Sequence, residues 1–378
     1  MTLFILDLAT NPLNTQKNAW DFVYYLGMAK DGFNASPMAS PFAYRYLTPL
    51  LVHGLFLAGL PINTGFILFA YLGGMAQLTG IFFFVKWLTR SNKGAYLAMA
   101  VTVLSLFNVK FLLFDIYRPD HLAYGLILLQ TYLAFKKRFF PLLVITFIAS
   151  QIREFNIIPL TAYLFMALRS EHRSVFIRQV VLSAICLTPA IILPRLLIPV
   201  TENYQIFGLS ADAIITTLIL PFLPSVDVNF IFSIIAYFLP LLLIADLKTI
   251  KTAFQSMSEE QRRYLTAYTI LVLLLSFLGG TDFNRFATFL FLPQIILIGL
   301  ITPSISNLQI GFVLISTFIF NRIWAHFPDW NVEKYRDFYG GFSLRLNMST
   351  LYRILECAGF LTLGYFIRKQ FLSIKEST

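Results

Sequence analysis

The sequence has few charged residues, because Asp, Glu, Lys and Arg together make up only 13% of its 378 residues. Soluble domains carry about 25% of these residues, so an ordinary soluble enzyme is excluded. Hydrophobic residues reach 57%, Phe alone occurs 40 times, and the mean hydropathy is +0.71. This composition predicts a membrane protein built from many apolar helices.

Cysteine is also scarce, and its two occurrences, Cys186 and Cys357, lie in apolar stretches far apart in the sequence. This excludes a disulfide framework and a CxxC metal site. A separate basic domain is missing too, although the formal net charge is +10. We therefore do not expect nucleic acid as a partner, and we interpret the positive charge as a topology signal.

Apolar stretches that approach the length of a membrane span occur along the whole chain. A helix needs about 20 apolar residues to cross the hydrocarbon core. The longer stretches are 62–88, 94–114, 175–198, 228–245, 264–281, 286–302, 306–324 and 346–367, and shorter runs lie at 121–135, 139–152 and 155–168. We expect an all-α polytopic membrane protein with about 11 transmembrane helices.

Clusters of Lys and Arg indicate the sides of these helices, because basic residues favour cytoplasmic loops. The clusters lie within 86–93, 136–138, 169–178, 248–263 and 368–375. Both ends of 139–168 are then cytoplasmic, which predicts a hairpin with its tip near Arg153 and Glu154. Its two arms are too short for full lipid-facing spans, so we expect them to pack within the bundle.

Residues 44–60 would reverse the sides of every later cluster if they crossed the membrane. Their Tyr, Arg, Pro and His content instead predicts a helix along the outer interface. The first eight residues are too short to span and lack the features of a signal peptide. We expect them to be the end of a helix that begins upstream, which would bring the total to about 12.

Four segments on the predicted outer side combine acidic residues with arginine. They are 9–45, 115–121, 151–156 and 281–285, and each lies at a helix end. Such pairs also occur wherever charges are tolerated at a membrane boundary. Four of them on one side favour a shared site, because Arg binds phosphate through paired hydrogen bonds and a carboxylate accepts a proton as general base.

The first outer segment contains the most specific pattern. Asp21 precedes a Tyr-rich turn that ends at Gly32, and an aromatic-Pro-Arg segment then opens the non-spanning helix. A long helix, a basic inner turn, a helix ending in an outer acid, and Arg153 ahead of Pro159 follow in order. This order resembles the GT-C glycosyltransferases, integral-membrane enzymes that use polyprenyl-phosphate-linked sugars, over about residues 15–170.

The resemblance implies a GT-C-like catalytic module at 1–170, with its first outer loop at 9–61. A variable transmembrane module would follow at 171–378, with outer loops at 199–227 and 325–350. The implied activity is inverting transfer of a hexosyl or pentosyl group from a polyprenyl-phosphate donor to a lipid-linked glycan or another acceptor. The implied location is the outer face of the plasma (inner) membrane, where the protein would contact membrane lipids. The resemblance leaves open whether a partner subunit takes part.

The resemblance also implies roles for individual residues. Asp21 matches the first-loop acid of the family and would be the catalytic base, while capping of the helix that begins at Phe22 is the structural alternative. The candidate donor phosphate ligands are Arg45, Arg118, Arg153 and Arg285, which the acids Asp115, Asp120, Glu154 and Asp282 would support. On the acceptor side we expect Trp330, Tyr335 and Tyr339 to stack on sugar rings, unless they form an interfacial belt.

A metal site is a weaker interpretation of the segment 115–121. Asp115, Asp120 and His121 supply ligands for a divalent cation, and some relatives use one in their outer loops. Arg118 lies between the two acids and competes for their charge. We therefore assign no cofactor. A divalent cation bound by these three residues is the alternative.

Two other functions remain open. An O-antigen-type polymerase or ligase also uses lipid-linked substrates, but its chemistry usually lies in large Arg-rich loops of the second half. A multi-span transporter or lipid flippase would have charges near the middle of the membrane and broken helices in corresponding halves. Lys110, Arg178 and Arg195 are the charges inside apolar runs, and no internal repeat is evident.

Overall fold

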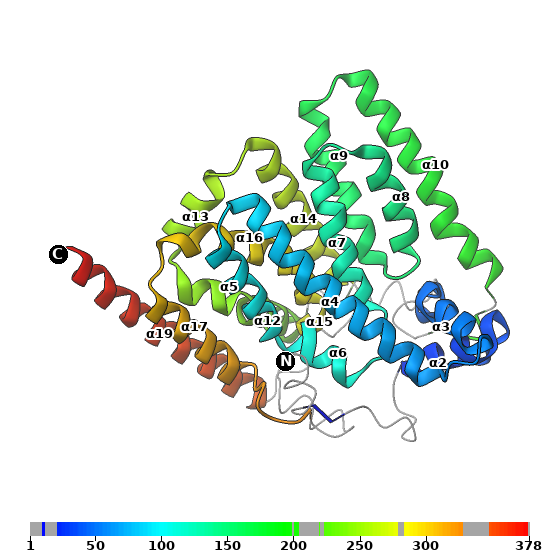
Figure 1. Cartoon of the computed structure of the whole chain (residues 1–378), viewed down its shortest axis with the longest axis horizontal. Helices are drawn as coiled ribbons and strands as arrows, with labels where there is room; N and C mark the ends of the chain where they lie inside the picture. The colour runs from blue at the N-terminus through cyan, green and yellow to red at the C-terminus, as the bar shows by residue number, and fades with distance from the viewer. Residues whose placement is uncertain are drawn as a thin grey trace.

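The computed structural model describes residues 10–11, 21–198, 200–203, 219, 223–278, 283–327 and 348–376, without the side chains of 202, 203 and 371–376. These residues form an all-α bundle (Figure 1). Its helices are α2 (Phe22–Asp31), α3 (Leu47–Leu57), α4 (Ile62–Thr89), α5 (Asn92–Val103), α6 (Phe111–Phe114), α7 (Asp120–Phe135), α8 (Phe139–Ser150), α9 (Ile158–Ser170), α10 (Arg173–Leu197), α12 (Pro224–Ile244), α13 (Leu247–Gln255), α14 (Glu259–Leu278), α15 (Phe283–Ala287), α16 (Phe291–Ile301), α17 (Asn307–Phe320) and α19 (Met348–Glu376).

Short segments connect these helices. The 3-10 turns are η1 (Gly32–Asn34), η2 (Phe42–Tyr44), η4 (Glu154–Ile157), η6 (Thr288–Leu290) and η7 (Thr302–Ser304), and η3 (Leu106–Lys110) is a π-helical turn. The strands β1 (Ala39–Ser40) and β2 (Glu202–Asn203) pair in parallel. This pairing joins the first outer segment to the residues that follow α10.

The main core lies where the long helices pack side by side. α4 packs along α7, α14 along α9, and α16 along α5 (Figure 1). The segment Phe283–Ser304 is 89% buried over its most apolar window, so it is the central helix of the bundle. A helix that is apolar on all sides, as α16 is, belongs in such a position.

The expected number of membrane spans is corrected by the structure. Helices occupy all of the ranges predicted from the sequence, but only four in the described part of the chain are long and apolar enough to cross a membrane, namely α4, α10, α12 and Phe283–Ser304. The helices α5 and η3–α6 bend by 65° and make a fifth span if they are counted together. The prediction of about 11 full spans is therefore wrong by this criterion.

Helix length explains most of this difference. α8 and α17 have 12 and 14 residues, which corresponds to roughly 18–21 Å, against about 30 Å for the hydrocarbon core. The longer helix α14 begins with Glu259, Glu260, Arg262 and Arg263, which lower its hydropathy. Apolar runs in the sequence thus marked real helices but overstated how many are full spans.

The hairpin predicted for 139–168 is confirmed, because α8 and α9 are joined by a turn that contains Arg153 and Glu154. Neither arm packs wholly within the bundle as expected, because α9 leaves Phe165 and Leu168 each 54% exposed and α8 also has an exposed face. Phe140 of α8 is 71% exposed, and Val144 and Phe147 are 41% and 43% exposed. This arm therefore presents an apolar face to its surroundings.

A second, smaller core lies under the first outer segment. Phe22, Tyr25 and Met28 recur on one face of α2 and are buried against aromatic residues of other elements. Those residues include Phe66 of α4 and Phe114 of α6. The helix predicted at 44–60 is present as α3, an 11-residue helix that packs on α2 and α4. This core fixes the position of the residues considered below.

The arginine–carboxylate pairs and the lysine-containing turns lie at opposite ends of the same helices. α7 begins at Asp120 beside Arg153 and ends just before Lys137, which pairs with Glu260 at 2.7 Å. At this second end Lys93 also donates to the Ile305 carbonyl. By the positive-inside rule we expect the second end to be cytoplasmic, and we call the first end the outer end of the bundle.

The α4–α7 contact depends on a missing side chain at Gly73. A Cβ at this position would lie 2.6 Å from the Cβ of His121 and 2.7 Å from its backbone carbon, whereas a Cβ at Gly74 would meet nothing within 4 Å. We expect Gly73→Ala to destabilise the protein by about 1–3 kcal/mol. The matched variant Gly74→Ala should be neutral or stabilising by up to about 1 kcal/mol, because Ala favours helices. Thermal unfolding in detergent compares the two, and equal midpoints would contradict this packing.

Candidate functional site

Four segments far apart in sequence meet at the outer end of the bundle. They are the start of α2, the turn before α3, the loop between α6 and α7, and the turn between α8 and α9. The first three sequence-predicted outer segments are thus brought together with their charged side chains in contact. We call the resulting group of Asp21, Tyr25, Arg45, Asp115, Arg118, Asp120, Arg153 and Glu154 the outer cluster.

One half of the outer cluster is organised by Arg118, whose side chain is 2% exposed. Its guanidinium pairs with the Asp21 carboxylate at 3.2 Å and donates to Asp115. It also lies 5.3 Å from the ring centre of Phe111. Asp21 precedes α2 but makes no side-chain capping hydrogen bond, so in this structure its carboxylate serves the ion pair and not the helix end.

The other half is organised by Glu154. Arg45 donates to both of its carboxylate oxygens, with Nε–Oε2 and Nη2–Oε1 distances of 3.0 and 2.5 Å. The same guanidinium lies 3.4 Å from the hydroxyl oxygen of Tyr25. Arg153 lies 3.8 Å from Glu154 and 3.0 Å from Asp120. These ion pairs form two groups, one around Arg118 and one around Glu154 and Arg153, and the segment 115–120 contributes acids to both.

Arg153 is the most enclosed member of the outer cluster, with 1% of its side chain exposed. The rings of Phe155 and Phe289 lie 6.0 Å from its guanidinium carbon. Within the described residues, its Nη1 and Nη2 atoms have no hydrogen-bond partner. A buried guanidinium usually donates several hydrogen bonds, so these two nitrogens are available to an oxygen-rich ligand.

The arginines shift the pKa values of the acids in different directions. Partial burial raises the pKa of Glu154, but Arg153 and Arg45 outweigh it and lower this pKa to about 2. Burial raises the pKa of Asp115, and Arg118 offsets this only in part. Burial lowers the pKa of Arg45, yet Glu154 brings it above its ordinary value. The cluster thus holds strongly ionised partners beside a carboxyl group that is harder to ionise.

The fourth predicted segment reaches the outer cluster only at its edge. Arg285 lies in α15, is 8% exposed, and stands 5.3 Å from the ring of Phe286. That ring stacks on Phe155, the neighbour of Glu154, at 5.7 Å. Asp282 and the acceptor-side candidates Trp330, Tyr335 and Tyr339 lie outside the described residues.

The alternative metal ligands do not come together as a set. No group of three or more His, Cys, Asp or Glu side chains that suits a metal is found within the described ranges. Asp115 faces Arg118 and Asp120 faces Arg153, so both carboxylates already have cationic partners. His121 is buried at the start of α7, and its Cβ packs against Gly73 of α4.

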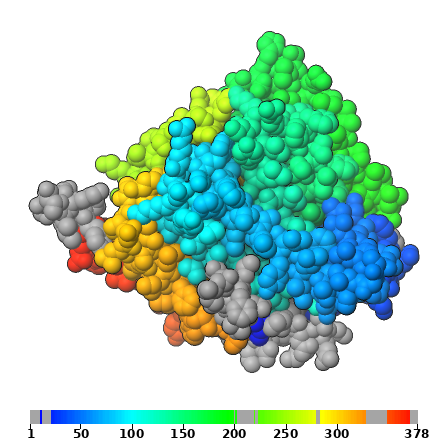
Figure 2. Space-filling view, in the orientation of Figure 1, coloured from blue at the N-terminus to red at the C-terminus, as the bar shows by residue number. Residues whose placement is uncertain are grey.

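An apolar groove of about 430 Å³ lies beside the outer cluster. Phe33 of η1 and Tyr46, the residue before α3, form one wall, and α8 and α10 form the other. The remaining lining residues are Phe147, Gln151, Pro189, Ala190, Leu193, Pro194, Leu197 and Ile198. Figure 2 shows these parts in contact, with the blue surface of the first segment next to the green surface of α10.

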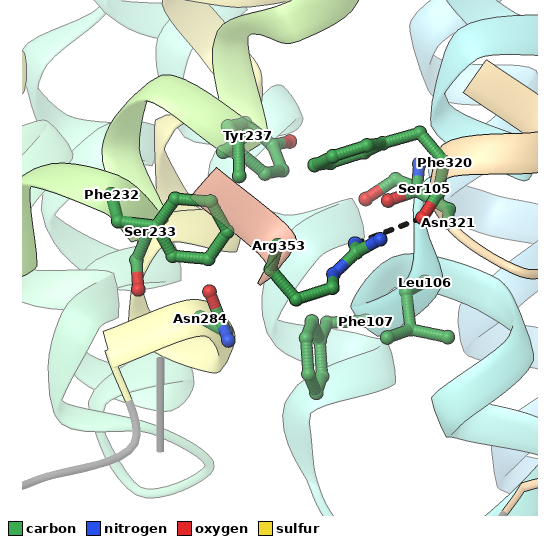
Figure 3. A pocket seen from close by; sticks show the side chains of 11 residues that line it. Ser105, Leu106, Phe107, Phe232, Ser233, Tyr237, Asn284, Phe320, Asn321 and Arg353 are labelled. Atoms are coloured by element: carbon green, nitrogen blue, oxygen red, sulfur yellow. Dashed lines mark hydrogen bonds between the residues drawn. The ribbon is translucent and has the colours of Figure 1, made fainter. Parts of the chain in front are cut away.

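A second group of buried cations was not predicted as a site from the sequence. Arg353 of α19, 4% exposed, donates to the Phe320 carbonyl at 2.9 Å and lines a small cavity of about 40 Å³ with Ser233, Tyr237 and Asn284 (Figure 3). Lys110 is fully buried nearby in the chain's broken helix and donates to the carbonyls of Arg322, Ile323 and Ala325. In the sequence, Arg353 and Lys110 were each marked only as a single basic residue within an apolar run.

Comparison with known proteins gives no further guide to the site, since no family model, curated protein or solved structure matches this chain.

The ion pairs of Glu154 predict a pH-dependent contribution to stability. Its pKa falls from 4.5 to about 2 on folding, so the ionised carboxylate stabilises the fold at neutral pH, and this contribution is lost as the pH falls from about 4.5 to about 2. Because the Glu154 side chain is 43% exposed, solvent screening reduces this contribution, and we expect Glu154→Gln to cost about 1–2 kcal/mol at pH 7, with a smaller difference from the unsubstituted protein at pH 3. Thermal unfolding between pH 7 and pH 3 measures both values.

The matched control is Glu260→Gln, whose partner Lys137 is 45% exposed, whereas the arginine partners of Glu154 are 6% and 1% exposed. Exposed pairs contribute little, so this variant should change stability by about 0.5 kcal/mol or less. A Glu154→Gln effect that stays the same at every pH would contradict the assignment of the lowered pKa.

Proposed function

We propose that the protein is an inverting glycosyltransferase that transfers a sugar from a polyprenyl-phosphate donor at the outer face of the membrane. The observation that carries this proposal is the outer cluster beside an apolar groove, which combines buried arginines, carboxylates and an apolar volume of about 430 Å³. The resemblance of residues 15–170 to GT-C enzymes supports the same function. The acceptor would be a lipid-linked glycan or another outer-face molecule.

The arginines are suited to the phosphate of the donor. Arg153 has two buried nitrogens without hydrogen-bond partners in the described part of the chain, and Arg45 lies on the other side of Glu154. Guanidinium groups bind phosphate oxygens through paired, charge-assisted hydrogen bonds. In a water-poor site such fixed cations stabilise the charge that develops on a departing lipid phosphate.

Asp21 is the carboxylate best placed to act as base. Its side chain is 17% exposed, whereas those of Asp115 and Asp120 are 1% and 2% exposed. Glu154 is accessible too, but a pKa of about 2 makes it a weak proton acceptor at neutral pH. Asp21 thus joins access to the outside with a position next to Arg118.

The proposed reaction is a direct displacement at the anomeric carbon. The acceptor hydroxyl oxygen forms the new glycosidic bond while Asp21 takes its proton, and the bond between the sugar and the lipid phosphate breaks. The electron pair of that bond leaves with the phosphate, which Arg153 and Arg45 stabilise. Attack from the side opposite the leaving group inverts the configuration.

The groove would hold the first isoprene units of the donor. Its lining is almost wholly apolar, and Tyr46 at its rim is adjacent in sequence to Arg45. A lipid chain in the groove would therefore place its phosphate near the guanidinium of Arg45. An O-antigen-type polymerase or ligase would use the same donor chemistry and differ in its acceptor, so it remains the alternative within this class.

A transporter is favoured by one observation, the bent helix at Leu106–Lys110 with its buried ammonium group. That group, however, is occupied by the backbone carbonyls at the end of α17. The polar cavity beside it holds only about 40 Å³. These contacts fit a structural role for Lys110 better than a transport path.

Transfer assays test the base assignment. We expect Asp21→Asn to lower transfer from polyprenyl-phosphate sugars by about 100-fold or more, because it removes the general base. The control Asp31→Asn changes an exposed acid at the other end of α2 and should keep full activity. Purified protein in liposomes, supplied with a panel of radiolabelled lipid-phosphate sugars, gives the rates. Equal rates for the two variants would eliminate Asp21 as base, and solute uptake without transfer would favour the transporter.

A substitution in the groove tests where the lipid lies. Leu193 and Ile192 are neighbours on α10 and are 49% and 45% exposed, but only Leu193 lines the groove. We expect Leu193→Trp to raise the KM for long-chain donors about 10-fold, because the indole would fill the channel. Ile192→Trp should leave KM unchanged. The same KM for both variants would place the lipid elsewhere.

A further inference from the structure

A cavity of about 810 Å³ lies at the end of the bundle opposite the outer cluster. Its walls are formed by α9 and α14, which pack along each other, and by residues of α13. This is the end that the positive-inside rule assigns to the cytoplasm. We call it the inner cavity.

One part of the inner cavity is basic. Arg169, Lys251, Arg262 and Arg263 line it, together with a single acid, Glu259. Glu259 pairs with Arg263 one turn along α14. For the other three cations, no acidic partner is found among the described residues. The cavity therefore has an excess of positive charge from three different helices.

The other part of the inner cavity is apolar and exposed. Phe165 and Leu168 of α9 are both 54% exposed, and Ile270 and Leu274 of α14 are 51% and 53% exposed. These side chains continue from the basic residues toward the middle of the bundle. A hydrocarbon chain is the natural neighbour of such a surface in a membrane, because exposed apolar groups in water would be unfavourable.

The helix α13 indicates where the basic part of the inner cavity lies relative to the membrane surface. It is strongly amphipathic, and none of its residues is buried. Lys248 and Lys251 lie on a helix whose apolar residues, Ile250 and Phe254, pack against the main core. A basic amphipathic helix of this kind lies in the interfacial plane at the level of lipid headgroups.

We propose that the inner cavity binds an anionic phospholipid of the inner leaflet. The phosphate and headgroup lie among Arg169, Lys251 and Arg262, and one acyl chain lies along the apolar wall between α9 and α14. Basic pockets between helices on the cytoplasmic side commonly bind anionic headgroups. This site is independent of the proposed glycosyl transfer, because it shares no residue with the outer cluster.

The combination of charge and apolar wall distinguishes a lipid from other anions. A free phosphate or a soluble headgroup would use the arginines alone and gain nothing from Leu168 or Leu274. An acidic protein segment would contact the basic rim without needing a channel that continues along the helices. A phospholipid occupies both parts at once.

The test uses the full chain in nanodiscs of phosphatidylcholine with an increasing fraction of phosphatidylglycerol. Native mass spectrometry counts the retained lipids. We expect Arg169→Gln combined with Arg262→Gln to weaken phosphatidylglycerol retention about 10-fold or more, because each basic residue near the surface attracts anionic lipid. The control Arg173→Gln with Arg178→Gln removes the same charge from exposed positions of α10 and should change retention less than 2-fold.

A second pair of measurements separates a lipid site from a simple anion site. Leu168→Ser with Leu274→Ser should lower phosphatidylglycerol retention while glycerol phosphate binds equally to variant and parent. Equal effects of the two arginine pairs would overturn the proposal in favour of general surface attraction. Lipid retention that is unaffected by either cavity variant, or glycerol phosphate binding as tight as that of the lipid, would overturn it as well.

Discussion

Neutralisation of buried charge is the constraint on which the outer end of the bundle depends. Arg118 and Arg153 are almost fully enclosed, and an unpaired charge in such a position would be very costly. Each guanidinium is therefore met by carboxylates from other segments. Because the partners come from distant parts of the sequence, pairing also fixes how α2, the start of α7 and the α8–α9 turn are placed.

Close backbone contacts carry this arrangement into the rest of the bundle. Gly73 lets α4 approach the first turn of α7, where Asp120 begins the helix and meets Arg153. Gly94 of α5 lets this helix approach the backbone of Gly299 in α16, and Gly299 makes room for Val85 of α4. Glycines thus occur where helix backbones pack closely, and ion pairs connect the ends of helices.

The sequence predicted helix positions well because apolar runs and their basic flanks are local signals. It predicted the hairpin tip at Arg153 for the same reason, and the grouping of Asp21, Arg118 and Arg153 followed from assigning sides to helix ends. The number of spans was overestimated, since hydropathy does not reveal that α17 stops after 14 residues or that α5 and α6 bend by 65°. The pairings themselves and the inner cavity depend on tertiary packing, which one sequence without relatives does not disclose.

The exposed apolar wall of α8 is too short for a bilayer of ordinary thickness. Its 12 residues span roughly 18 Å, against about 30 Å of hydrocarbon. Lipid beside this wall must thin to match it. If the protein acts on a lipid-borne phosphate as proposed, such a depression would bring the headgroup layer to the level of the α8–α9 turn, which contains Arg153.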